Sequence, residues 1–465
     1  MFALIIPYFV FCFFNRATLK FIASRTSLGV IPFAPCCSLL LMKIAVIGLG
    51  YVGFPLACAI AHNKSYEVCG FDLSEQKIEL IKDRKSPVED ERAKEDIKTV
   101  NINASSEPDV IKDSEIFLIC VPTPVHKDYM PDLDPIEKAV KMVAQYLKKG
   151  TVVVIESTVN PGVCEEIVVP ILEKETGMKA GEDFDVAHCP ERINPGDTKW
   201  NVYNIPRNIG ATSPKACKKI ADFYRSFLEG EINEMSSLKV AEATKIVENT
   251  FRDINIAYVN ELAKSFDVLG IDLIEVIKGA SNKPFAFMPH FPSCGVGGHC
   301  IPVDPYYLIE RAKKSGFKHT FLSTAREVNN SMPIYTVKLL TEALNEVEKS
   351  VKGTKIGILG VSYKSNVGDT RESPSVRMIK MLKDKGADLE IYDPYLPQES
   401  TKGSTDDLLS DAEAVLIATD HDEFKKLELQ DFTKNGIQVL IDGKNIFNKT
   451  SFSHPDLIYK GIGRG

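Results

Sequence analysis

Short apolar runs alternate with amphipathic segments along most of this chain. The stretch Lys43–Ala61 has the pattern of a buried strand, a glycine turn and the start of a helix, and further apolar runs lie at Glu115–Pro124 and Thr151–Thr158. Apolar runs of this length are typical of strands buried on both faces. Strands that alternate with helical segments predict a parallel, doubly wound sheet.

The pattern changes at Ser236, from which one helical segment continues to Gly270. Ser237 is a suitable N-cap and Gly270 a suitable residue to end the helix. With a rise of 1.5 Å per residue, this helix would be about 50 Å long. We expect a helix of that length to bridge domains or to form part of a dimer interface.

The first pattern returns near the C-terminus. The stretch "KIGILGVSYK" at Lys355–Lys364 resembles "KIAVIGLGYV", and "DAEAVLIATD" at Asp411–Asp420 resembles "DSEIFLICVP". We therefore expect a second Rossmann-like sheet related to the first. It lacks the third glycine and has a longer loop, so we expect that it does not hold a dinucleotide in the same way.

Composition limits the function classes. A chain of 465 residues is too long for one ordinary domain, so two or three are expected. The net charge of −7 and the lack of a basic patch interleaved with aromatic residues argue against nucleic acid as a partner. The 11 cysteines form no C-x-x-C pair, which is typical of free thiols in a reducing cytoplasm.

The first 41 residues differ from the rest. They begin with "MFALIIPYFVFCFF", which is apolar, has no basic segment before it and is too short to span a bilayer as a helix. A membrane anchor is one interpretation. We expect instead that residues 1–41 are a poorly ordered extension, that Met42 begins the functional chain, and that a membrane is not a partner.

Three glycines after the first strand, Gly48, Gly50 and Gly53, fit the pattern G-x-G-x-x-G, and Asp72 ends the next strand. Small residues there let the backbone approach a pyrophosphate at the helix N-terminus, and the acid can accept a bond from a ribose hydroxyl. The same acid would repel a 2′-phosphate. The pattern predicts a site for NAD in preference to NADP; the alternative is a tight turn without a ligand.

Other polar residues lie where ligands bind in such folds. The strand ends "VPTP" and "EST" place Thr123 and Thr158 at the carboxyl edge of the sheet, although strand-end capping explains both equally well. A second set of polar residues shares one face of the long helix. A Pro/Gly-rich loop, "PERINPG", adds two charged residues. The alternative interpretation of both is a solvated surface. These helix and loop residues are Lys245, Asn249, Arg252, Glu191 and Arg192.

The loop "GVGGHCIPVDP" carries the candidate nucleophile, Cys300. The thiolate is the reactive form of cysteine, and Lys245 or a helix N-terminus would favour it. We expect the glycines to clear the loop so that substrate and cofactor both reach the thiol. Asp304-Pro305 also suits an N-cap followed by the first helical position. Zinc bound by Cys294, His299 and Cys300 is not expected, because adjacent His-Cys ligands give poor tetrahedral geometry.

From Met42 onward the chain resembles the UDP-glucose/GDP-mannose dehydrogenase family, whose members are NAD-dependent nucleotide-sugar 6-dehydrogenases. The resemblance rests on motifs that occur in the family's order: "GLGYVG", "VPTP", "ESTVNPG", "PERINPG", "AEATKIVENTFRDINIAYVNEL", "GVGGHCIPVDP", "SYKSNVGDTRESP" and "DGKN". It implies an α/β fold with two Rossmann-like, doubly wound parallel sheets, joined by a long central helix and a helical dimerisation region. The expected domains are an NAD-binding domain at 42–235, a central helical domain at 236–332 that forms a homodimer, and a UDP-sugar-binding domain at 333–465.

The resemblance also implies roles for individual residues. Cys300 would be the nucleophile, with Lys245 and Asn249 stabilising oxyanion-like intermediates, and Asp304, Glu191 and Thr158 completing the catalytic set. The residues expected to bind NAD are Gly48, Gly50, Tyr51, Val52, Gly53, Asp72, Lys77, Thr123 and Thr158. Those expected to bind the UDP-sugar are Glu191, Arg192, Lys245, Asn249, Arg252, Gly297, Tyr363, Lys364 and Arg371, and no metal is expected.

The cysteine loop indicates the branch of the family. The UDP-glucose type usually has a serine and a lysine where this chain has His299 and Val303, and the loop is similar instead to enzymes of UDP-N-acetylhexosamines. Pro284 and Ala286 stand where the bacterial UDP-N-acetylmannosamine type has a His and an Arg, so the resemblance to the UDP-N-acetylglucosamine type is greater. The predicted activity is a four-electron oxidation of C6 through a cysteine thioester. The alternatives are UDP-glucose as substrate, a simple two-electron dehydrogenase, and a non-catalytic protein that binds NAD or a nucleotide sugar.

Overall fold

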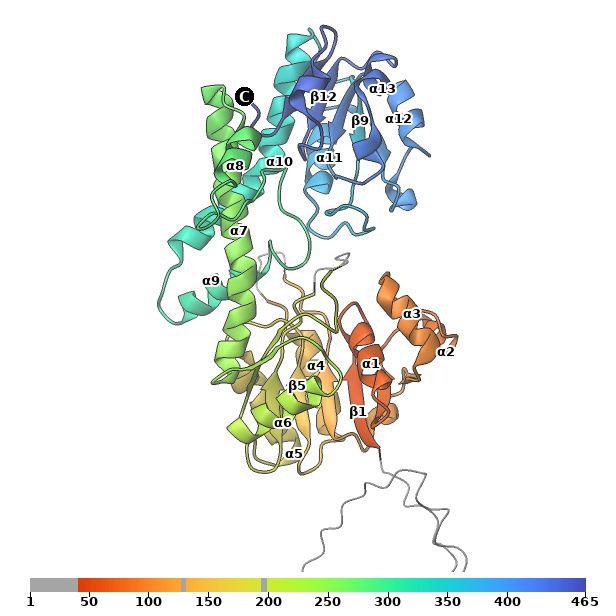
Figure 1. Cartoon of the computed structure of the whole chain (residues 1–465), viewed down its shortest axis with the longest axis vertical. Helices are drawn as coiled ribbons and strands as arrows, with labels where there is room; N and C mark the ends of the chain where they lie inside the picture. The colour runs from red at the N-terminus through yellow and green to blue at the C-terminus, as the bar shows by residue number, and fades with distance from the viewer. Residues whose placement is uncertain (1–40, 127–130, 194–198) are drawn as a thin grey trace, which may run out of the picture. The chain divides into compact units, whose positions relative to one another are not determined.

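The computed structural model describes residues 41–126, 131–193 and 199–465 (Figure 1). The expectation for the N-terminal extension concerns residues that, except for Leu41, lie outside this part. Within the described residues, no helix is long and apolar enough to cross a membrane.

The first sheet has eight strands in the order β3-β2-β1-β4-β5-β6-β7-β8. Its strands are β1 (Met42–Ile47), β2 (Tyr66–Phe71), β3 (Asn103–Ser105), β4 (Ile116–Ile119), β5 (Val152–Ile155), β6 (Asp185–His188), β7 (Arg207–Ala211) and β8 (Ile232–Glu234). Helices α1 (Gly53–His62), α2 (Glu75–Lys82), α3 (Glu91–Thr99), α4 (Asp134–Ala144), α5 (Val169–Thr176) and α6 (Pro214–Arg225) accompany it. Alternate strand residues contribute to two separate apolar cores, one on each face, as a doubly wound sheet requires.

The parallel sheet predicted from the apolar runs is confirmed for β1 to β6, and β7 departs from it. β7 pairs with β6 in the antiparallel direction. The described parts of the connection between them, residues 189–193 and 199–206, contain no helix. Because an antiparallel neighbour needs no crossover helix, the chain can return directly along the sheet edge. This reversal places the first residue of β7, Arg207, beside the carboxyl ends of β5 and β6.

The long helix is confirmed as α7 (Leu238–Leu269). The Ser237 side chain accepts a hydrogen bond from the backbone N–H of Val240, and Gly270 ends the helix with a left-handed φ of +66°. Helix α10 (Thr320–Glu346) lies beside α7 (Figure 1), with a small apolar core between them and α8 (Leu273–Ala280). Buried polar pairs also join α7 and α10, among them Asn260 with Asn329 at 2.9 Å.

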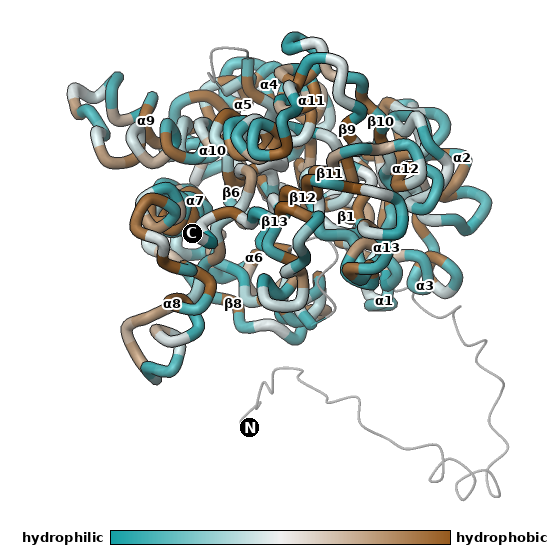
Figure 2. The backbone as a smooth tube through the Cα atoms, turned by 90° about the horizontal axis from the view of Figure 1, so that it is seen from above, coloured by the Kyte–Doolittle hydropathy of each residue, from teal (hydrophilic) through white to brown (hydrophobic). Residues whose placement is uncertain are grey.

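The second sheet is wholly parallel, as predicted, in the order β10-β9-β11-β12-β13. Its strands are β9 (Lys355–Leu359), β10 (Asp388–Tyr392), β11 (Ala414–Ile417), β12 (Val439–Asp442) and β13 (Ile458–Gly461), with α11 (Pro374–Asp384), α12 (Thr405–Asp411) and α13 (Leu429–Thr433). Apolar residues, brown in Figure 2, follow the strands of both sheets.

The acid that follows β10, Asp393, occupies the place that Asp72 holds in the first sheet. One of its carboxylate oxygens accepts from the backbone N–H groups of Val361 and Ser362, each at 2.8 Å, and from the Ser362 hydroxyl. His421 lies 3.2 Å from the same oxygen. The carboxylate is thus bonded to the turn after β9 and lies beside His421, whereas Asp72 in the first sheet lies beside Lys77.

The glycines before Cys300 have a packing role that the sequence did not reveal. A Cβ at Gly297 would lie 2.7 Å from the Cβ of Tyr363, and one at Gly298 would lie 2.7 Å from the Tyr363 ring. A Cβ at Gly295 would lie 3.0 Å from Pro374. The N–H of Gly298 also donates to the carbonyl of Arg371 at 3.0 Å. The loop is bare because its backbone packs directly against the segment between β9 and α11.

We predict that Gly298→Ala lowers the free energy of unfolding by about 1–3 kcal/mol, because φ is +93° and the new methyl group meets the Tyr363 ring. Gly279→Ala is the matched control: its Cβ would meet nothing within 4 Å, so we expect a gain of about 0.5–1 kcal/mol. Urea unfolding of both variants measures the difference. Equal stability of Gly298→Ala and the wild type would show that the loop does not pack in this way.

Candidate active site

The glycine turn after β1 has one open position. A Cβ at Gly53 would lie 1.9 Å from the Gly48 carbonyl, and one at Gly48 would lie 2.7 Å from the Cys120 carbonyl, so these two glycines are required by the fold. A Cβ at Gly50 would meet nothing within 4 Å. Internal packing therefore does not explain Gly50, whereas close approach of a pyrophosphate does. Tyr51 follows it and is exposed.

Asp72 and Lys77 meet at the end of β2, as expected for a ribose site. One carboxylate oxygen of Asp72 accepts from the backbone N–H of Leu49 at 2.8 Å and lies 3.0 Å from the Lys77 Nζ. The other oxygen accepts from the N–H of Ser74 at 2.9 Å. The acid is thereby fixed against the glycine turn, where it would contact a dinucleotide bound along that turn.

The two threonines at the strand ends differ. Thr123 is buried, and its carbonyl accepts a hydrogen bond of 2.7 Å from the hydroxyl of Tyr307, which ties the sheet edge to α9 (Asp304–Lys314). Thr158 is partly exposed at the end of the next strand. Their contact with a cofactor stays a prediction.

Helix α7 turns two of its three predicted polar residues inward. Lys245 and Asn249 are 9% and 7% exposed, so a solvated stripe does not describe them, whereas Arg252 is exposed. The side-chain amide of Asn249 donates to a carboxylate oxygen of Asp304 at 2.6 Å. This bond joins α7 to the first turn of α9.

The prediction that Asp304 caps its helix is wrong. Helix α9 begins at Asp304 itself, the cap position is Val303, and no side chain there bonds the backbone. The carboxylate bonds Asn249 instead, because that tertiary partner lies within reach and the site is buried. Burial raises the pKa of Asp304 to about 6, against the opposing effects of the Asn249 hydrogen bond and the Lys245 charge. A carboxyl group with this pKa exchanges its proton readily near neutral pH.

Cys300 is the exposed member of this group. Its carbonyl accepts from the N–H groups of Val303 and Asp304, at 3.0 and 2.8 Å, so the thiol precedes α9 in a tight turn. The protein packed around the thiol raises its pKa, and the negative charge of Asp304 adds to the rise. Lys245 lowers it, as expected, and Arg371 and Arg252 act in the same direction with smaller effect. Burial and Asp304 therefore disfavour the Cys300 thiolate, whereas Lys245, Arg371 and Arg252 favour it.

The neighbouring cysteine has a different environment. Cys294 is fully buried, its thiol lies 3.5 Å from the Ala418 carbonyl, and its N–H donates to the Gly443 carbonyl at 2.8 Å. It packs the loop onto the second sheet. In the part of the chain that the structure describes, no group of three or more His, Cys, Asp or Glu side chains is arranged to hold a metal ion.

The segment expected to bind the nucleotide lies next to the cysteine loop. Arg371 is exposed and forms a two-pronged ion pair with Asp369, with its Nη2 at 2.6 Å. The Tyr363 ring covers Gly298, and the charge of Arg371 acts on both Cys300 and His299. Lys364, partly buried, belongs to the same segment. The structure thus brings Tyr363, Arg371 and Gly297 to the candidate nucleophile.

The loop "PERINPG" contributes Glu191 and Arg192, while its last three residues, 194–196, lie outside the described part of the chain. Glu191 is 7% exposed, and Arg192 forms an ion pair with Glu248 at 2.6 Å. Sequence reasoning missed the residue that holds Glu191, which is Arg207, at 2.7 Å. The available signal was an arginine at the start of a short strand, Arg207–Ala211.

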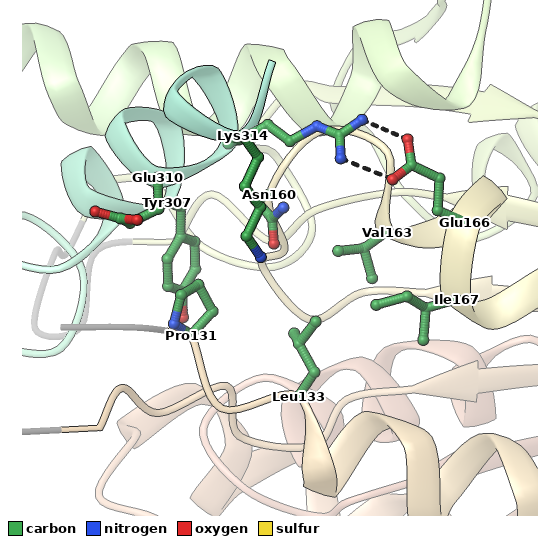
Figure 3. Close-up of a pocket in the computed structure, with 10 residues that line it drawn as sticks. Pro131, Leu133, Asn160, Val163, Glu166, Ile167, Tyr307, Glu310 and Lys314 are labelled. Carbon is green, nitrogen blue, oxygen red and sulfur yellow. Dashed lines mark hydrogen bonds and ion pairs between the residues drawn. The ribbon is translucent and has the colours of Figure 1, made fainter. Parts of the chain in front are cut away.

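A separate small cavity of about 140 Å³ adjoins α9 (Figure 3). Tyr307 and Lys314 face it from the helix, opposite Asn160 and Val163, and the ion pair between Arg311 and Glu166 closes one side. It contains neither Cys300 nor its polar neighbours, so it is not the candidate active site.

Three models of the UDP-glucose/GDP-mannose dehydrogenase family match this chain: the NAD binding domain at residues 42–228, the central domain at 239–331 and the UDP binding domain at 357–449. A UDP-N-acetyl-D-mannosamine dehydrogenase of Pyrococcus horikoshii is 38% identical over 91% of this chain and 100% of its own. A UDP-N-acetyl-D-glucosamine 6-dehydrogenase of Pseudomonas aeruginosa is 35% identical over 85% and 94%. The solved structure of the UDP-D-ManNAc dehydrogenase from Pyrococcus horikoshii matches with a TM-score of 0.86 and 36% identity, over 91% of this chain and all of that one.

We predict that Asp304→Asn raises the free energy of unfolding at pH 7.5 by about 2–3 kcal/mol. The folded state binds the Asp304 proton more tightly than the unfolded chain, so this group's contribution to stability is lost as pH rises from about 4 through about 6. The same change should speed alkylation of Cys300 at pH 7.5, because it removes a negative charge that raises the thiol pKa.

Urea unfolding and peptide mass spectrometry of alkylated Cys300 measure the two effects. Lys245→Met is the opposite control and should slow alkylation, since Lys245 lowers the thiol pKa. Slower alkylation in Asp304→Asn than in the wild type would refute the electrostatic account of this site.

Proposed function

This chain belongs to the UDP-glucose/GDP-mannose dehydrogenase family, and from that premise we propose that it oxidises the C6 hydroxyl of a UDP-N-acetylhexosamine to a carboxylate. The observation that carries the proposal is the position of Cys300. The thiol is exposed between the buried polar residues of α7 and α9 and the segment that holds Arg371. A two-electron dehydrogenase would need no thiol there.

The residues present fit NAD, which would supply the hydride acceptor for both oxidations when bound. Gly50 leaves the glycine turn open, and Asp72 with Lys77 stands at the ribose position. We propose that Tyr51, Val52, Thr123 and Thr158 complete this site together with Gly48 and Gly53. The carboxylate of Asp72 favours NAD over NADP.

Cys300 acts as the nucleophile of the proposed reaction. C6 loses a hydride and its hydroxyl loses a proton, which gives an aldehyde. The thiol sulfur then adds to the aldehyde carbon and a proton goes to the aldehyde oxygen, which forms a thiohemiacetal. Loss of a second hydride and proton leaves a thioester. Water adds to the thioester carbon, the C–S bond breaks, and the carboxylate, the thiol and one proton are released. The thiol divides one difficult oxidation into steps that hydride transfer can complete.

The neighbours of Cys300 have the properties that these steps need. Asp304, with a pKa of about 6, exchanges protons with the hydroxyl and the thiol. Lys245 and Asn249 stabilise the oxyanions that form at C6. Glu191 orients the water. The UDP-sugar is held by Arg192, Arg252, Gly297, Tyr363, Lys364 and Arg371, of which Lys364 and Arg371 contact the diphosphate.

The sugar is proposed from the loop and from the relatives together. His299 and Val303 replace residues of the UDP-glucose type, and the relatives above are named for UDP-N-acetyl sugars. They are named for both C2 epimers, at 38% and 35% identity, so similarity to them does not select one epimer. Pro284 and Ala286 favour the UDP-N-acetylglucosamine type.

We further propose the domain boundaries 42–235, 236–332 and 333–465, a cytoplasmic location and a homodimer formed through α7. All eight cysteines in the described residues are free thiols, which suits a reducing compartment. The dimer rests on an apolar stripe of α7: Val240, Val247, Phe251 and Tyr258, which are 39%, 56%, 47% and 57% exposed. Their spacing of seven, four and seven residues is that of a coiled-coil seam, which a second copy of the same helix would cover.

The function is tested by initial rates of NADH formation with a panel of UDP-sugars. We predict preference for UDP-N-acetylglucosamine or UDP-N-acetylmannosamine over UDP-glucose. Cys300→Ala should lose formation of the uronate by several orders of magnitude, because the covalent route is removed. Cys294→Ala is the control and should keep most activity. A clear preference for UDP-glucose would overturn the proposed substrate. Near-normal uronate formation by Cys300→Ala would overturn the proposed mechanism.

For the dimer, we predict that the double substitution Val247→Glu with Phe251→Glu yields a monomer, because it places charges in the seam. Light scattering after size-exclusion chromatography measures the mass. Phe317→Glu, at an exposed position outside α7, is the control and should leave the mass unchanged. A monomeric wild type would refute the dimer. A double variant that stays dimeric would show that the interface lies elsewhere.

A further inference from the structure

One buried arginine holds two carboxylates at the carboxyl edge of the first sheet. Arg207, at the start of β7, is 1% exposed. One of its terminal nitrogens lies 2.8 Å from the carboxylate of Glu156, which follows β5, and the other lies 2.7 Å from that of Glu191, which follows β6. The guanidinium carbon also lies over the ring of Tyr224, 5.3 Å from the ring centroid. The hydroxyl of Tyr224 donates to Glu156.

The two carboxylates differ in how they balance the charge of Arg207. Two carboxylates share one cation, and burial raises the pKa of Glu156 to about 7, in spite of the opposing charge of Arg207. When Glu156 carries a proton, the single positive charge is balanced by Glu191 alone. The other oxygen of Glu191 accepts from the N–H groups of Arg192 and Ile193, at 2.6 and 2.7 Å. The Glu191 carboxylate is therefore fixed by three donors.

The residue after Glu191 joins its loop to the helix that lies next to the candidate nucleophile. Arg192 pairs with Glu248 on α7, and the next residue of the helix, Asn249, donates to Asp304. The N–H of Asp304 donates to the carbonyl of Cys300. The loop that carries Glu191 is thus tied to α7 one residue before Asn249, whose partner Asp304 follows the turn that carries the thiol.

We propose that Arg207 is a positioning residue for the thioester step, acting through Glu191, which it holds in the orientation that places water against the thioester carbon. The inference rests on the proposed function, since it concerns the hydrolysis of the Cys300 thioester. In that step water adds to the thioester carbon, the C–S bond breaks, and the products are the carboxylate, the Cys300 thiol and one proton. Arg207 itself is 1% exposed, so we assign it no contact with the substrate.

Arg207→Lys keeps the charge but loses the fork that reaches both carboxylates. We expect kcat to fall about 10- to 100-fold, as for a displaced catalytic group, while the KM values for NAD and the UDP-sugar stay within about threefold. Intact-protein mass spectrometry during turnover should show the thioester accumulating. Glu191→Gln should give the same result, and the double variant should be no slower than Glu191→Gln alone, because one residue acts through the other.

Arg326→Lys is the matched control: Arg326 is equally buried, at 2%, but pairs with Asp253 on α7. It should lose stability without accumulating a thioester, and its effect should add to that of Glu191→Gln. Glu156→Gln should keep kcat within about threefold, because Arg207 then serves Glu191 alone. If Arg207→Lys does not fold, the double variant Arg207→Gln with Glu156→Gln replaces it. This double variant leaves no unpaired carboxylate at position 156, and we expect the same accumulation of the thioester.

The outcomes separate this inference from the function on which it rests. A wild type that turns over no UDP-sugar refutes the proposed function. If the wild type turns over the UDP-sugar but Arg207→Lys leaves kcat unchanged, only the role of Arg207 is refuted. The same holds if the effects of Arg207→Lys and Glu191→Gln are additive. Accumulation of the thioester in Arg207→Lys but not in Arg326→Lys supports that role.

Discussion

The hydrogen bond between Asn249 and Asp304 is the contact on which the candidate site depends. It joins the long helix α7 to the first turn of α9, and α9 begins immediately after the loop that carries Cys300. On its other side that loop packs against Tyr363, with no side chains on Gly297 and Gly298 to separate them. The thiol is held between a helix of the central segment and the second sheet, so the geometry of both determines where it lies.

Two carboxyl groups, those of Asp304 and Glu156, are buried in and near the candidate site. Burial raises the pKa of Asp304 and that of Glu156, so each carboxylate is less stable in the folded protein than in water. Both are opposed by specific partners, Asn249 and Lys245 for the first and Arg207 for the second. Buried ionisable groups with specific partners are typical of active sites, where function offsets a cost in stability.

Local sequence patterns predicted the features that depend on neighbours in the chain. Ser237 and Gly270 predicted both ends of α7, and Gly48, Gly53 and Asp72 predicted the turn and the acid of the first sheet, because capping and tight turns are decided within a few residues. The prediction for Asp304 was wrong since its preference for an N-cap yielded to a bond with a residue 55 positions earlier.

Features that depend on distant contacts could not be predicted in this way. Arg207 pairs with carboxylates 51 and 16 positions earlier, and the reversed direction of β7 that brings it there leaves no local pattern. The glycines of the cysteine loop were predicted to matter for access to the thiol, but their contact with Tyr363, some 65 residues later, required the structure.

The central claim is that Cys300 carries the substrate through two oxidations. The most direct measurement is a single-turnover reaction with enzyme in excess over UDP-N-acetylhexosamine, in which NADH is counted against uronate and against free aldehyde. The account predicts two NADH for each uronate, no free aldehyde, and a transient acyl adduct on the peptide that contains Cys300. One NADH for each sugar, with an aldehyde or ketone as the product and no adduct on Cys300, would contradict it.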